Sequence, residues 1–359
     1  MKTLRVLIAG GGTGGHVIPA LAIGRELVKQ YGAGLCFVGT ARGIETRLIP
    51  EAGFLLELIH VGQLKNVSLK TKLSTLGDLP RGVTRCIALL RAFKPDVVVG
   101  VGGYASGPAM IAAVLLHIPT VAYEPNAVPG LANRLVGKFV SAAAVNFPET
   151  VKYFRNAVVT GVPVRQEIFD IPAKHDGPPR LLIFAGSQGA RVFNEMMPQI
   201  VVALLQAVPG LSIVHQAGAR HAEATQTAYE ASGADTSRWR VCAFLDDMPA
   251  QYAAADLVLC RSGSTVAELC AAGKPSLLVP FPQAADDHQR KNAEVLAKAG
   301  AAAMWIEAGL TPDDLLQELV DLLMDPMRLD AMSAKAKAMA KPGAVEKIAA
   351  MVQLLARLD

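Results

Sequence analysis

Glycine-rich turns that could hold phosphate follow three short apolar segments of the chain. Because glycine has no side chain, such a turn lets the backbone approach a ligand. The helix that follows presents unpaired N–H groups and a positive dipole end, which favour an anion. Three such turns, divided between the two halves of the chain, predict two facing domains that share phosphate-bearing ligands. The apolar segments and their turns are residues 4–9 with 10–16, 97–99 with 100–107, and 181–184 with 185–190.

A histidine that could act as a general base lies directly after the first turn. His16 opens the helix that follows the glycines. A helix N-terminus disfavours imidazolium, so the ring stays neutral and can accept a proton near neutral pH. A lone histidine is more often structural, but this position favours catalysis. Glu124 and Asn126 follow another predicted strand at the same end. Asn126 could hydrogen-bond sugar hydroxyls or an amide, and Glu124 could orient His16.

A hydroxyl-rich turn in the second half predicts a further phosphate contact. Ser264 and Thr265 would cap a helix and could bond a phosphate. Glu268 follows one turn later, where a carboxylate can hold both hydroxyls of a ribose. The alternative is an ordinary capping box, because Thr265 and Glu268 have its spacing. Gln289 opens another predicted helix and is a candidate contact for sugar hydroxyls.

The first turn also satisfies the dinucleotide fingerprint, which keeps an NADP-dependent oxidoreductase as an alternative. Gly10, Gly12 and Gly15 have the required spacing. That reading needs an acid near the end of the second strand to hold a ribose. No acid precedes Glu45 there, although Arg42 could serve a 2′-phosphate.

Neither a metal nor a nucleic acid is expected. The Asp246-Asp247 and Asp286-Asp287 doublets point to different sides of a helix, and no D-x-D motif occurs. The five cysteines include no CxxC pair, which argues against a zinc site or a disulfide framework. Aromatic content is 5%, without basic–aromatic interleaving, which argues against nucleic-acid binding.

The chain reads as two α/β domains. At 359 residues it exceeds the size at which one core usually stops growing. Apolar runs alternate with helical stretches, which predicts parallel sheets whose ligands bind at the carboxyl ends of the strands. We expect domains at 1–163 and 164–340, and an amphipathic helix at 341–359 that packs back on the first domain. The expected strands are 4–9, 35–38, 97–101, 120–122, 142–145, 157–160, 180–184, 211–216, 239–244, 257–260, 276–279 and 302–306.

Charge is distributed unevenly between these domains. Residues 1–163 hold 17 Lys and Arg against 8 Asp and Glu, a net charge of +9, whereas the remainder carries −5. A basic first domain predicts contact with a polyanionic surface. No segment approaches the ~18 apolar residues of a membrane span. An apolar stripe at helical spacing, with basic residues around it, predicts either a helix packed in the core or a helix that binds anionic lipid at the membrane surface. Its residues are Leu69, Leu73, Leu76, Lys70, Lys72, Arg81 and Arg85.

Taken together and in order, the motifs resemble the MurG family of bacterial glycosyltransferases. They are GGGTGGH at 10–16, GGYASGP at 102–108, EPN at 124–126, GSQGAR at 186–191 and RSG at 261–263. Members add N-acetylglucosamine to the lipid-linked muramyl pentapeptide of peptidoglycan synthesis. The resemblance implies a GT-B fold, in which two Rossmann-like, doubly wound parallel-sheet domains face a central cleft.

The resemblance also assigns residues to the two substrates. UDP-N-acetylglucosamine would be held mainly by the second domain, and the acceptor would be lined by the first. Family pattern places Leu245 at uracil through its backbone, Glu268 at the ribose and Gln289 at the sugar. Arg165 matches a family arginine after the interdomain break. The diphosphate and donor contacts would be Ser187, Gln188, Ser264 and Thr265, and the acceptor-side residues Thr13, Gly14, Gly15 and Asn126.

The implied reaction is an inverting transfer to the 4-hydroxyl of undecaprenyl-pyrophosphoryl-muramyl-pentapeptide, with His16 as base and no cofactor or metal. The implied location is peripheral, on anionic lipids at the cytoplasmic face of the inner membrane. Two other GT-B activities remain as alternatives: a glycolipid glycosyltransferase with another acceptor, and a UDP-N-acetylglucosamine 2-epimerase.

Overall fold

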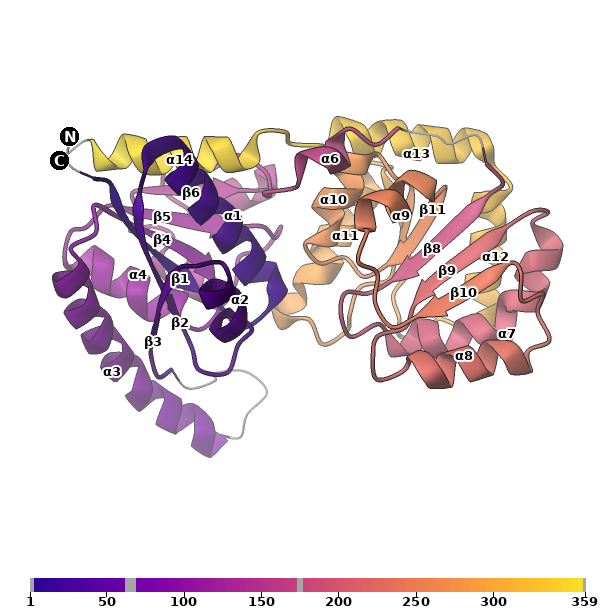
Figure 1. Cartoon of the computed structure of the whole chain (residues 1–359), viewed down its shortest axis with the longest axis horizontal. Coiled ribbons are helices and arrows are strands. Elements are labelled where there is room, and N and C mark those ends of the chain that lie inside the picture. The colour runs from indigo at the N-terminus through magenta and orange to yellow at the C-terminus, as the bar shows by residue number, and fades with distance from the viewer. Residues whose placement is uncertain (1–2, 62–68, 173–176, 358–359) are drawn as a thin grey trace. The chain divides into compact units, whose positions relative to one another are not determined.

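Two parallel β-sheets organise the chain, one in each half (Figure 1). The computed structural model describes residues 3–61, 69–172 and 177–357, and the side chains of all of these except 69–78. The chain divides into two compact units. Unit 1 is Met1–Pro163 with Gly343–Asp359, and unit 2 is Val164–Pro342.

The sheet of unit 1 has the strand order β3-β2-β1-β4-β5-β6-β7, with every neighbouring pair parallel. The order reverses between β1 and β4, so the turns that follow these two strands lie side by side. Ligands of such sheets bind at this switch point. The strands are β1 (Arg5–Gly10), β2 (Gly34–Gly39), β3 (Leu55–Leu58), β4 (Val97–Gly102), β5 (Thr120–Glu124), β6 (Ala142–Val145) and β7 (Ala157–Val159).

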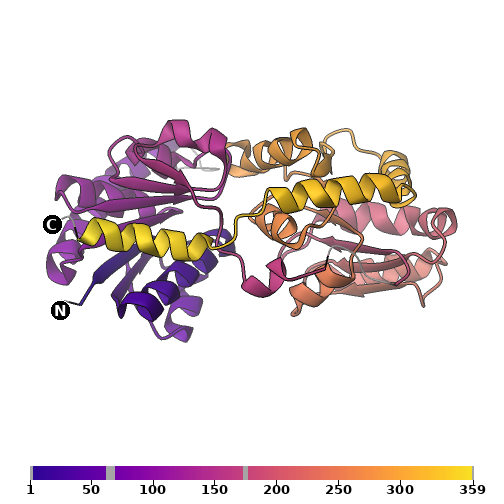
Figure 2. The same ribbon diagram turned by 90° about the horizontal axis from the view of Figure 1, so that it is seen from above.

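Helices cover both faces of this sheet (Figures 1 and 2). Alternate strand residues point to opposite sides, so Val6 and Ile8 pack with α1, α2 and α14, whereas Leu7 and Ala9 pack with α3, α4 and α5. Both faces are therefore apolar, as parallel sheets require. The helices are α1 (Gly14–Tyr31), α2 (Glu45–Glu51), α3 (Leu69–Phe93), α4 (Ser106–Leu115), α5 (Leu131–Val136), the 3₁₀ helix η1 (Pro148–Tyr153) and α14 (Ala344–Ala356).

The C-terminal helix α14 belongs to the core of unit 1. Ile348, Ala349 and Val352 are fully buried against α1 and the sheet. Their spacing of one and four residues puts them on one helix face, and burying an aliphatic side chain of this size contributes about 1.5–3 kcal/mol. Unit 1 is therefore built from two segments that are far apart in the sequence, because the chain crosses to unit 2 after Pro163 and returns at Gly343.

Unit 2 repeats the doubly wound pattern with the order β10-β9-β8-β11-β12-β13, again with all neighbouring strands parallel. Its order reverses between β8 and β11, which makes the third glycine turn a neighbour of the hydroxyl-rich turn. The strands are β8 (Arg180–Phe184), β9 (Ser212–Gln216), β10 (Trp239–Cys242), β11 (Leu257–Cys260), β12 (Ser276–Leu278) and β13 (Ala302–Met304).

A core cluster of unit 2 lies between its sheet and the helices α7 (Arg191–Ala207) and α12 (Pro312–Leu323). Leu315, Leu319 and Leu322 recur at helical spacing on α12 and are fully buried. The helices of this unit are α6 (Gln166–Phe169), α7 (Arg191–Ala207), α8 (Ala222–Ala231), α9 (Met248–Ala254), α10 (Thr265–Ala272), the 3₁₀ helix η2 (Ala285–Asp287), α11 (His288–Lys298), α12 (Pro312–Leu323) and α13 (Pro326–Ala338).

Sequence patterning misses one strand of unit 1. Strand β3 (Leu55–Leu58) is the outer strand beside β2, and it is not among the expected strands. Its burial is partial, with Leu55 and Leu58 exposed. An edge strand that is short and only half covered lacks the continuous apolar run that marks a central parallel strand.

A buried histidine in β9 makes the stability of unit 2 sensitive to acid. His215 is 1% exposed, and its Nδ1 lies 3.1 Å from the hydroxyl of Tyr229. Burial lowers the pKa of His215 to about 3. An unfolded histidine titrates near 6.5. Between about pH 6.5 and pH 3 the unfolded chain binds a proton at this histidine and the folded chain does not. The contribution to the unfolding free energy that is present above pH 6.5 is therefore lost as the pH falls towards 3.

We expect His215 to remove about 2 kcal/mol from the unfolding free energy of unit 2 between pH 7.5 and pH 5. Urea unfolding at both pH values measures this loss, and His215→Gln should abolish that part of the pH dependence. The exposed His221 of the same unit supplies the control, because His221→Gln should keep the wild-type dependence. Equal pH dependence in both variants would contradict the assignment.

Candidate functional site

The first glycine turn is held from within the protein by a buried carboxylate. The Gly12 N–H donates to Oε2 of Glu45 at 2.8 Å, and the Thr40 N–H and hydroxyl both donate to Oε1 at 3.0 Å. Burial opposes the charged form, but these hydrogen bonds outweigh it and leave the pKa of Glu45 below its ordinary value. The Gly12 N–H is thus occupied by protein.

Glycine is required in the first two turns because neither the Glu45 side chain nor the neighbouring backbone leaves room for a Cβ. A Cβ on Gly11 would lie 2.2 Å from Glu45, and one on Gly103 would lie 2.3 Å from the carbonyl oxygen of Gly11. Gly103 also has a φ of +80°, which side chains rarely adopt. Close packing therefore accounts for several of these glycines. Glu45, facing its own turn, is not available to a dinucleotide ribose.

His16 lies where the first two turns meet. Its ring packs against Gly102 of β4, where an added Cβ would be 2.9 Å from Cδ2 of the imidazole. The hydroxyl of Thr13 is 3.4 Å from Nδ1 of the same ring. The ring is half-buried at the carboxyl ends of β1 and β4. Gly14 and Gly15 form the first turn of α1 beside it. The structure thus places the predicted base at the switch point of unit 1.

Glu124 is the centre of a loop that includes Asn126. Its Oε1 accepts from the Asn126 N–H and side-chain amide, each at 3.0 Å. Its Oε2 accepts from the Gly130 N–H at 3.1 Å and from Nδ2 of Asn133 at 3.0 Å. Burial raises the pKa of Glu124, and these donors oppose the rise. Glu124 therefore shapes the Asn126 loop, and its predicted action on His16 stays a prediction.

In unit 2 the third glycine turn rests on the loop after β9. Gly189 and Gly218 both have positive φ, and a Cβ on Gly218 would lie 2.2 Å from the carbonyl oxygen of Gln188. Ser187 and Gln188 are exposed at the outer side of this turn. Helix α7 begins immediately afterwards, at Arg191. The turn thus has a fixed backbone and two polar side chains open to solvent.

The capping-box reading of the hydroxyl-rich turn is wrong. Helix α10 begins at Thr265, so Ser264 occupies the N-cap position that the box would require of Thr265. Glu268 instead accepts a hydrogen bond from the Tyr252 hydroxyl, 2.8 Å from Oε2. Burial raises the pKa of Glu268, and the Tyr252 hydroxyl and the Arg165 charge oppose this. Glu268 is thus a partly buried acceptor, as the ribose hypothesis requires.

Gln289 lies beside the same turn. The Ser262 hydroxyl donates to the carbonyl oxygen of Gln289 at 2.7 Å, and Nδ2 of Asn292 donates to the carbonyl oxygen of Ser262 at 3.0 Å. The side-chain oxygen of Gln289 accepts from the Phe281 N–H at 3.0 Å. Its Nε2 faces Gly263. The start of α11 is therefore tied to the turn after β11, which brings Gln289 and Ser264 into one region.

Arg261 connects the turn after β11 to neighbouring loops and helices, a role that could not be predicted from the sequence. Its Nη1 donates to the carbonyl oxygens of Val279 at 3.0 Å and Pro280 at 3.1 Å, and lies 2.6 Å from Oε2 of Glu307. Its guanidinium also stacks over Phe193 and Phe281, each at 5.4 Å. Three segments, residues 279–281, Glu307 and helix α7, thus converge on one side chain. Tyr252 is a second residue that sequence reasoning missed, because no spacing marks its contact with Glu268.

Two other predicted donor residues lie in unit 2. Leu245 is 7% exposed, and its loop ends where Asp247 caps α9 by accepting from the Ala250 N–H at 3.1 Å. Arg165 is exposed, and its Nη1 is 2.8 Å from Oε1 of Glu167. Its charge also acts on Glu268. A hydrogen bond therefore joins Tyr252 to Glu268, and the positive charge of Arg165 acts on both groups.

The predicted membrane patch is described only in part. The side chains of Leu69, Leu73, Leu76, Lys70 and Lys72 lie outside the described residues, although α3 includes these positions. Arg81 and Arg85 are exposed, and Nη2 of Arg85 is 3.5 Å from Oε2 of Glu57. Across the ranges that the structure covers, helices are too short or too polar to span a bilayer, and His, Cys, Asp and Glu form no cluster suited to a metal ion.

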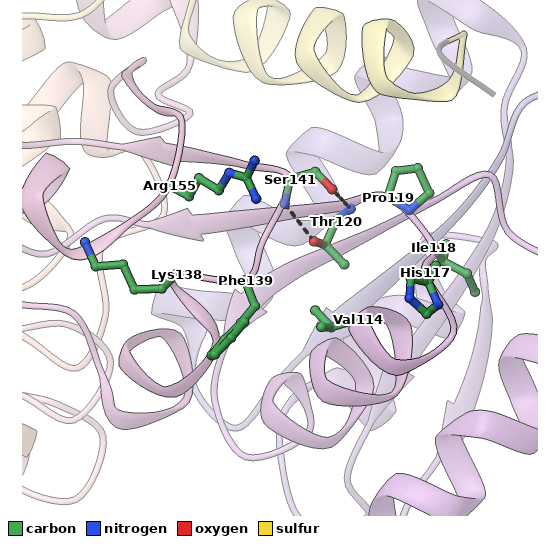
Figure 3. A pocket seen from close by; sticks show the side chains of 9 residues that line it. All are labelled: Val114, His117, Ile118, Pro119, Thr120, Lys138, Phe139, Ser141 and Arg155. Carbon is green, nitrogen blue, oxygen red and sulfur yellow. Dashed lines mark hydrogen bonds between the residues drawn. The ribbon is translucent and has the colours of Figure 1, made fainter.

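A hollow of about 350 Å³ opens on unit 1, at the amino ends of β5 and β6 (Figure 3). It lies at the opposite end of the sheet from the glycine turns. Thr120 and Ser141 bridge its floor: each N–H donates to the hydroxyl of the other, at 3.1 and 3.0 Å. Its lining residues are Val114, His117, Ile118, Pro119, Thr120, Lys138, Phe139, Ser141 and Arg155.

Comparison with known proteins places both units in one enzyme family. Residues 6–145 match the glycosyltransferase family 28 N-terminal domain, and residues 180–348 match its C-terminal domain. An Anaeromyxobacter dehalogenans (strain 2CP-C) protein is 44% identical over 361 residues, covering 99% of this chain and 94% of that protein. It is named UDP-N-acetylglucosamine--N-acetylmuramyl-(pentapeptide) pyrophosphoryl-undecaprenol N-acetylglucosamine transferase. The chain belongs to the MurG family of hexosyltransferases.

Solved structures agree with this assignment. The crystal structure of Acinetobacter baumannii MurG matches with a TM-score of 0.83 and 33% identity, covering 98% of this chain and 99% of that one. The two sheets are therefore the two halves of the GT-B fold of the MurG family. A UDP-N-acetylglucosamine 2-epimerase from Listeria monocytogenes, described as putative, matches with a TM-score of 0.72 and 16% identity, covering 100% of this chain and 98% of that one. At that identity the likeness shows the fold alone.

We expect Glu45→Gln to destabilise unit 1 by about 1–3 kcal/mol, because a neutral amide replaces an ionised acceptor of buried hydrogen bonds. Thermal unfolding should show a fall of about 2–12 °C in the transition of this unit. Glu51→Gln on the same helix is the control, since its ion pair with Arg47 is exposed and contributes little. An unchanged transition in Glu45→Gln would contradict the role given to this carboxylate.

Proposed function

We propose that this chain transfers N-acetylglucosamine from UDP-N-acetylglucosamine to the 4-hydroxyl of the muramyl sugar in undecaprenyl-pyrophosphoryl-muramyl-pentapeptide. The observation that carries the proposal is the full-length similarity to a transferase of that name, at 44% identity. Two groups of side chains support it. One surrounds the start of α10 in unit 2, and the other surrounds His16 in unit 1.

The donor is assigned to unit 2. The N-terminus of α10, with Ser264 and Thr265, offers N–H groups and hydroxyls to the diphosphate. Ser187 and Gln188 add polar side chains from the neighbouring turn, and the backbone at Leu245 receives uracil. Glu268 accepts from the ribose hydroxyls, Gln289 contacts the sugar and Arg165 supplies positive charge. These groups stabilise the negative charge that develops on UDP as it leaves.

The acceptor is assigned to unit 1, with His16 as the general base. The 4-hydroxyl oxygen attacks C1 of the donor sugar from the face opposite the diphosphate. As the new C–O bond forms, the bond from C1 to the diphosphate breaks and its electron pair leaves with UDP. The hydroxyl proton passes to the imidazole of His16. Thr13, Gly14, Gly15 and Asn126 line this region, and the single displacement inverts the configuration at C1.

A labelled-donor assay tests the proposal directly. Transfer of the labelled sugar should require the lipid-linked muramyl pentapeptide. Conversion of the donor to its 2-epimer without acceptor would contradict the proposal and support an epimerase. Stabilisation of the protein by NADPH but not by UDP would support an oxidoreductase instead.

We expect His16→Ala to lower kcat about 10²–10⁴-fold, the usual contribution of a positioned general base. Calorimetric binding of UDP should change less than twofold, because the nucleotide is held by unit 2. The exposed His60 of the same unit gives a matched control, and His60→Ala should keep wild-type kcat. Full turnover by His16→Ala would remove the base assignment.

We propose further that unit 1 binds anionic lipid peripherally at the cytoplasmic face of the inner membrane. The hollow in Figure 3 is bordered by Lys138 and Arg155, and Phe139 beside them is 69% exposed. Leu115 and Leu135 are also exposed, on α4 and α5, and α4 packs against the basic helix α3. Apolar side chains among cations are typical of surfaces that dock on anionic bilayers. Such docking would bring unit 1 to a lipid-linked acceptor.

We expect the double variant Lys138→Glu, Arg155→Glu to lower binding to phosphatidylglycerol vesicles more than tenfold, because each cation near the surface contributes about 1 kcal/mol and reversal adds repulsion. Vesicle co-sedimentation measures the change, and phosphatidylcholine vesicles should bind neither protein strongly. The control places the same charge change on exposed residues of unit 2, Arg240→Glu with Lys298→Glu. An equal loss in both variants would show a net-charge effect and contradict a defined surface.

A further inference from the structure

Among the described residues, the buried tyrosine of α9 makes a side-chain hydrogen bond with the predicted ribose acceptor. Tyr252 is fully buried, and its hydroxyl donates to Oε2 of Glu268 at 2.8 Å. Its ring packs edge-on against Phe184 of β8, with centroids 6.0 Å apart and an interplanar angle of 70°. Packing therefore fixes the ring, and the fixed ring aims its hydroxyl at one carboxylate oxygen.

The hydrogen bond from Tyr252 affects the protonation of Glu268. The carboxylate is partly buried, and burial raises its pKa because it disfavours the charged form. The Tyr252 hydroxyl and the positive charge of Arg165 act in the opposite direction. An ionised carboxylate only accepts hydrogen bonds, whereas a protonated one also donates. The two neighbours thus keep Glu268 suited to receive hydroxyl donors.

We propose that Tyr252 is a positioning residue that holds Oε2 of Glu268, so that Oε1 is presented to the ribose hydroxyls of the uridine nucleotide. This inference rests on the proposed function, in which Glu268 contacts the ribose. It assigns to Tyr252 a part in discriminating ribose from deoxyribose. A buried acceptor left without its hydroxyl donor is costly, so the pair rejects a nucleotide that lacks one.

The test compares UDP-N-acetylglucosamine with its 2′-deoxy analogue in Tyr252→Phe, which keeps the ring and removes the hydroxyl. We expect KM for the natural donor to rise about tenfold with kcat within twofold, because a Glu268 carboxylate that Tyr252 no longer holds binds the ribose hydroxyls less well. The preference for ribose over 2′-deoxyribose, measured as the ratio of kcat/KM values, should fall at least fivefold. A purely structural tyrosine would leave that preference unchanged.

The pH dependence gives a second readout. Removal of the hydroxyl donor lets the pKa of Glu268 rise, because the interaction that opposes burial is lost. On acidification, KM for the donor should therefore begin to increase at a higher pH in Tyr252→Phe than in wild type. Coinciding profiles would overturn the inference.

A matched control exists in the same unit. Tyr229 is also fully buried, and its hydroxyl contacts His215. Tyr229→Phe should keep the donor KM and the ribose preference of wild type. If both tyrosine variants lose preference equally, the effect is a general loosening of unit 2 and the inference falls.

Calorimetry with UDP and 2′-deoxy-UDP separates failure of the inference from failure of the proposed function. Glu268→Gln should lose most of the preference for UDP. If it keeps the full preference, Glu268 does not contact the ribose and that part of the proposed function is wrong. If Glu268→Gln loses the preference and Tyr252→Phe keeps it, the ribose contact stands and the role of Tyr252 is overturned.

Discussion

Parallel pairing of neighbouring strands is the constraint on which every site in this chain depends. In a parallel sheet all carboxyl ends meet at one edge, and the order of a doubly wound sheet reverses at one pair of strands. That pair is β1 and β4 in unit 1, and β8 and β11 in unit 2. The turns after each pair are therefore neighbours, although about 90 residues separate the first two and about 80 the second two. His16 lies at the first junction. Ser187 and Ser264 follow the strands of the second.

Buried carboxylates then fix the loops at these edges. Glu45 holds the first glycine turn, Glu124 holds the Asn126 loop, and Glu268 lies against Tyr252. Each loses hydration on folding, and each recovers hydrogen bonds from its own loop or from a neighbouring helix. The balance differs: donors outweigh burial at Glu45, whereas burial dominates at Glu124 and Glu268. A carboxylate that accepts several hydrogen bonds from loop residues fixes the conformation of that loop. A carboxylate that accepts few can still accept hydrogen bonds from a ligand.

Much of the architecture could be predicted from the sequence, because the patterns that indicate strands, turns and helices involve residues close together in the chain. Apolar strands, glycine turns and helical spacing predict parallel α/β units, and the structure has them at the expected places except for the edge strand β3. The same signals located the turns that bear Ser187 and Ser264. For Glu268 they left two interpretations open, a ribose contact and a capping box with Thr265, and the capping box does not form. The spacing of Thr265 and Glu268 could not show that the partner of Glu268 is Tyr252. That hydroxyl comes from another helix, α9.

What the amino-acid sequence determined by itself was the family, the α/β class and the positions of residues next to glycine turns, since each depends on residues close together in the chain. Tertiary structure decided the partners: Glu45 with Gly12, Arg261 with Glu307 and Tyr252 with Glu268. Those pairs form only when strand order and helix packing bring distant segments together. Burial, which sets whether a carboxylate serves as a backbone anchor or a ligand contact, is likewise a property of the folded unit.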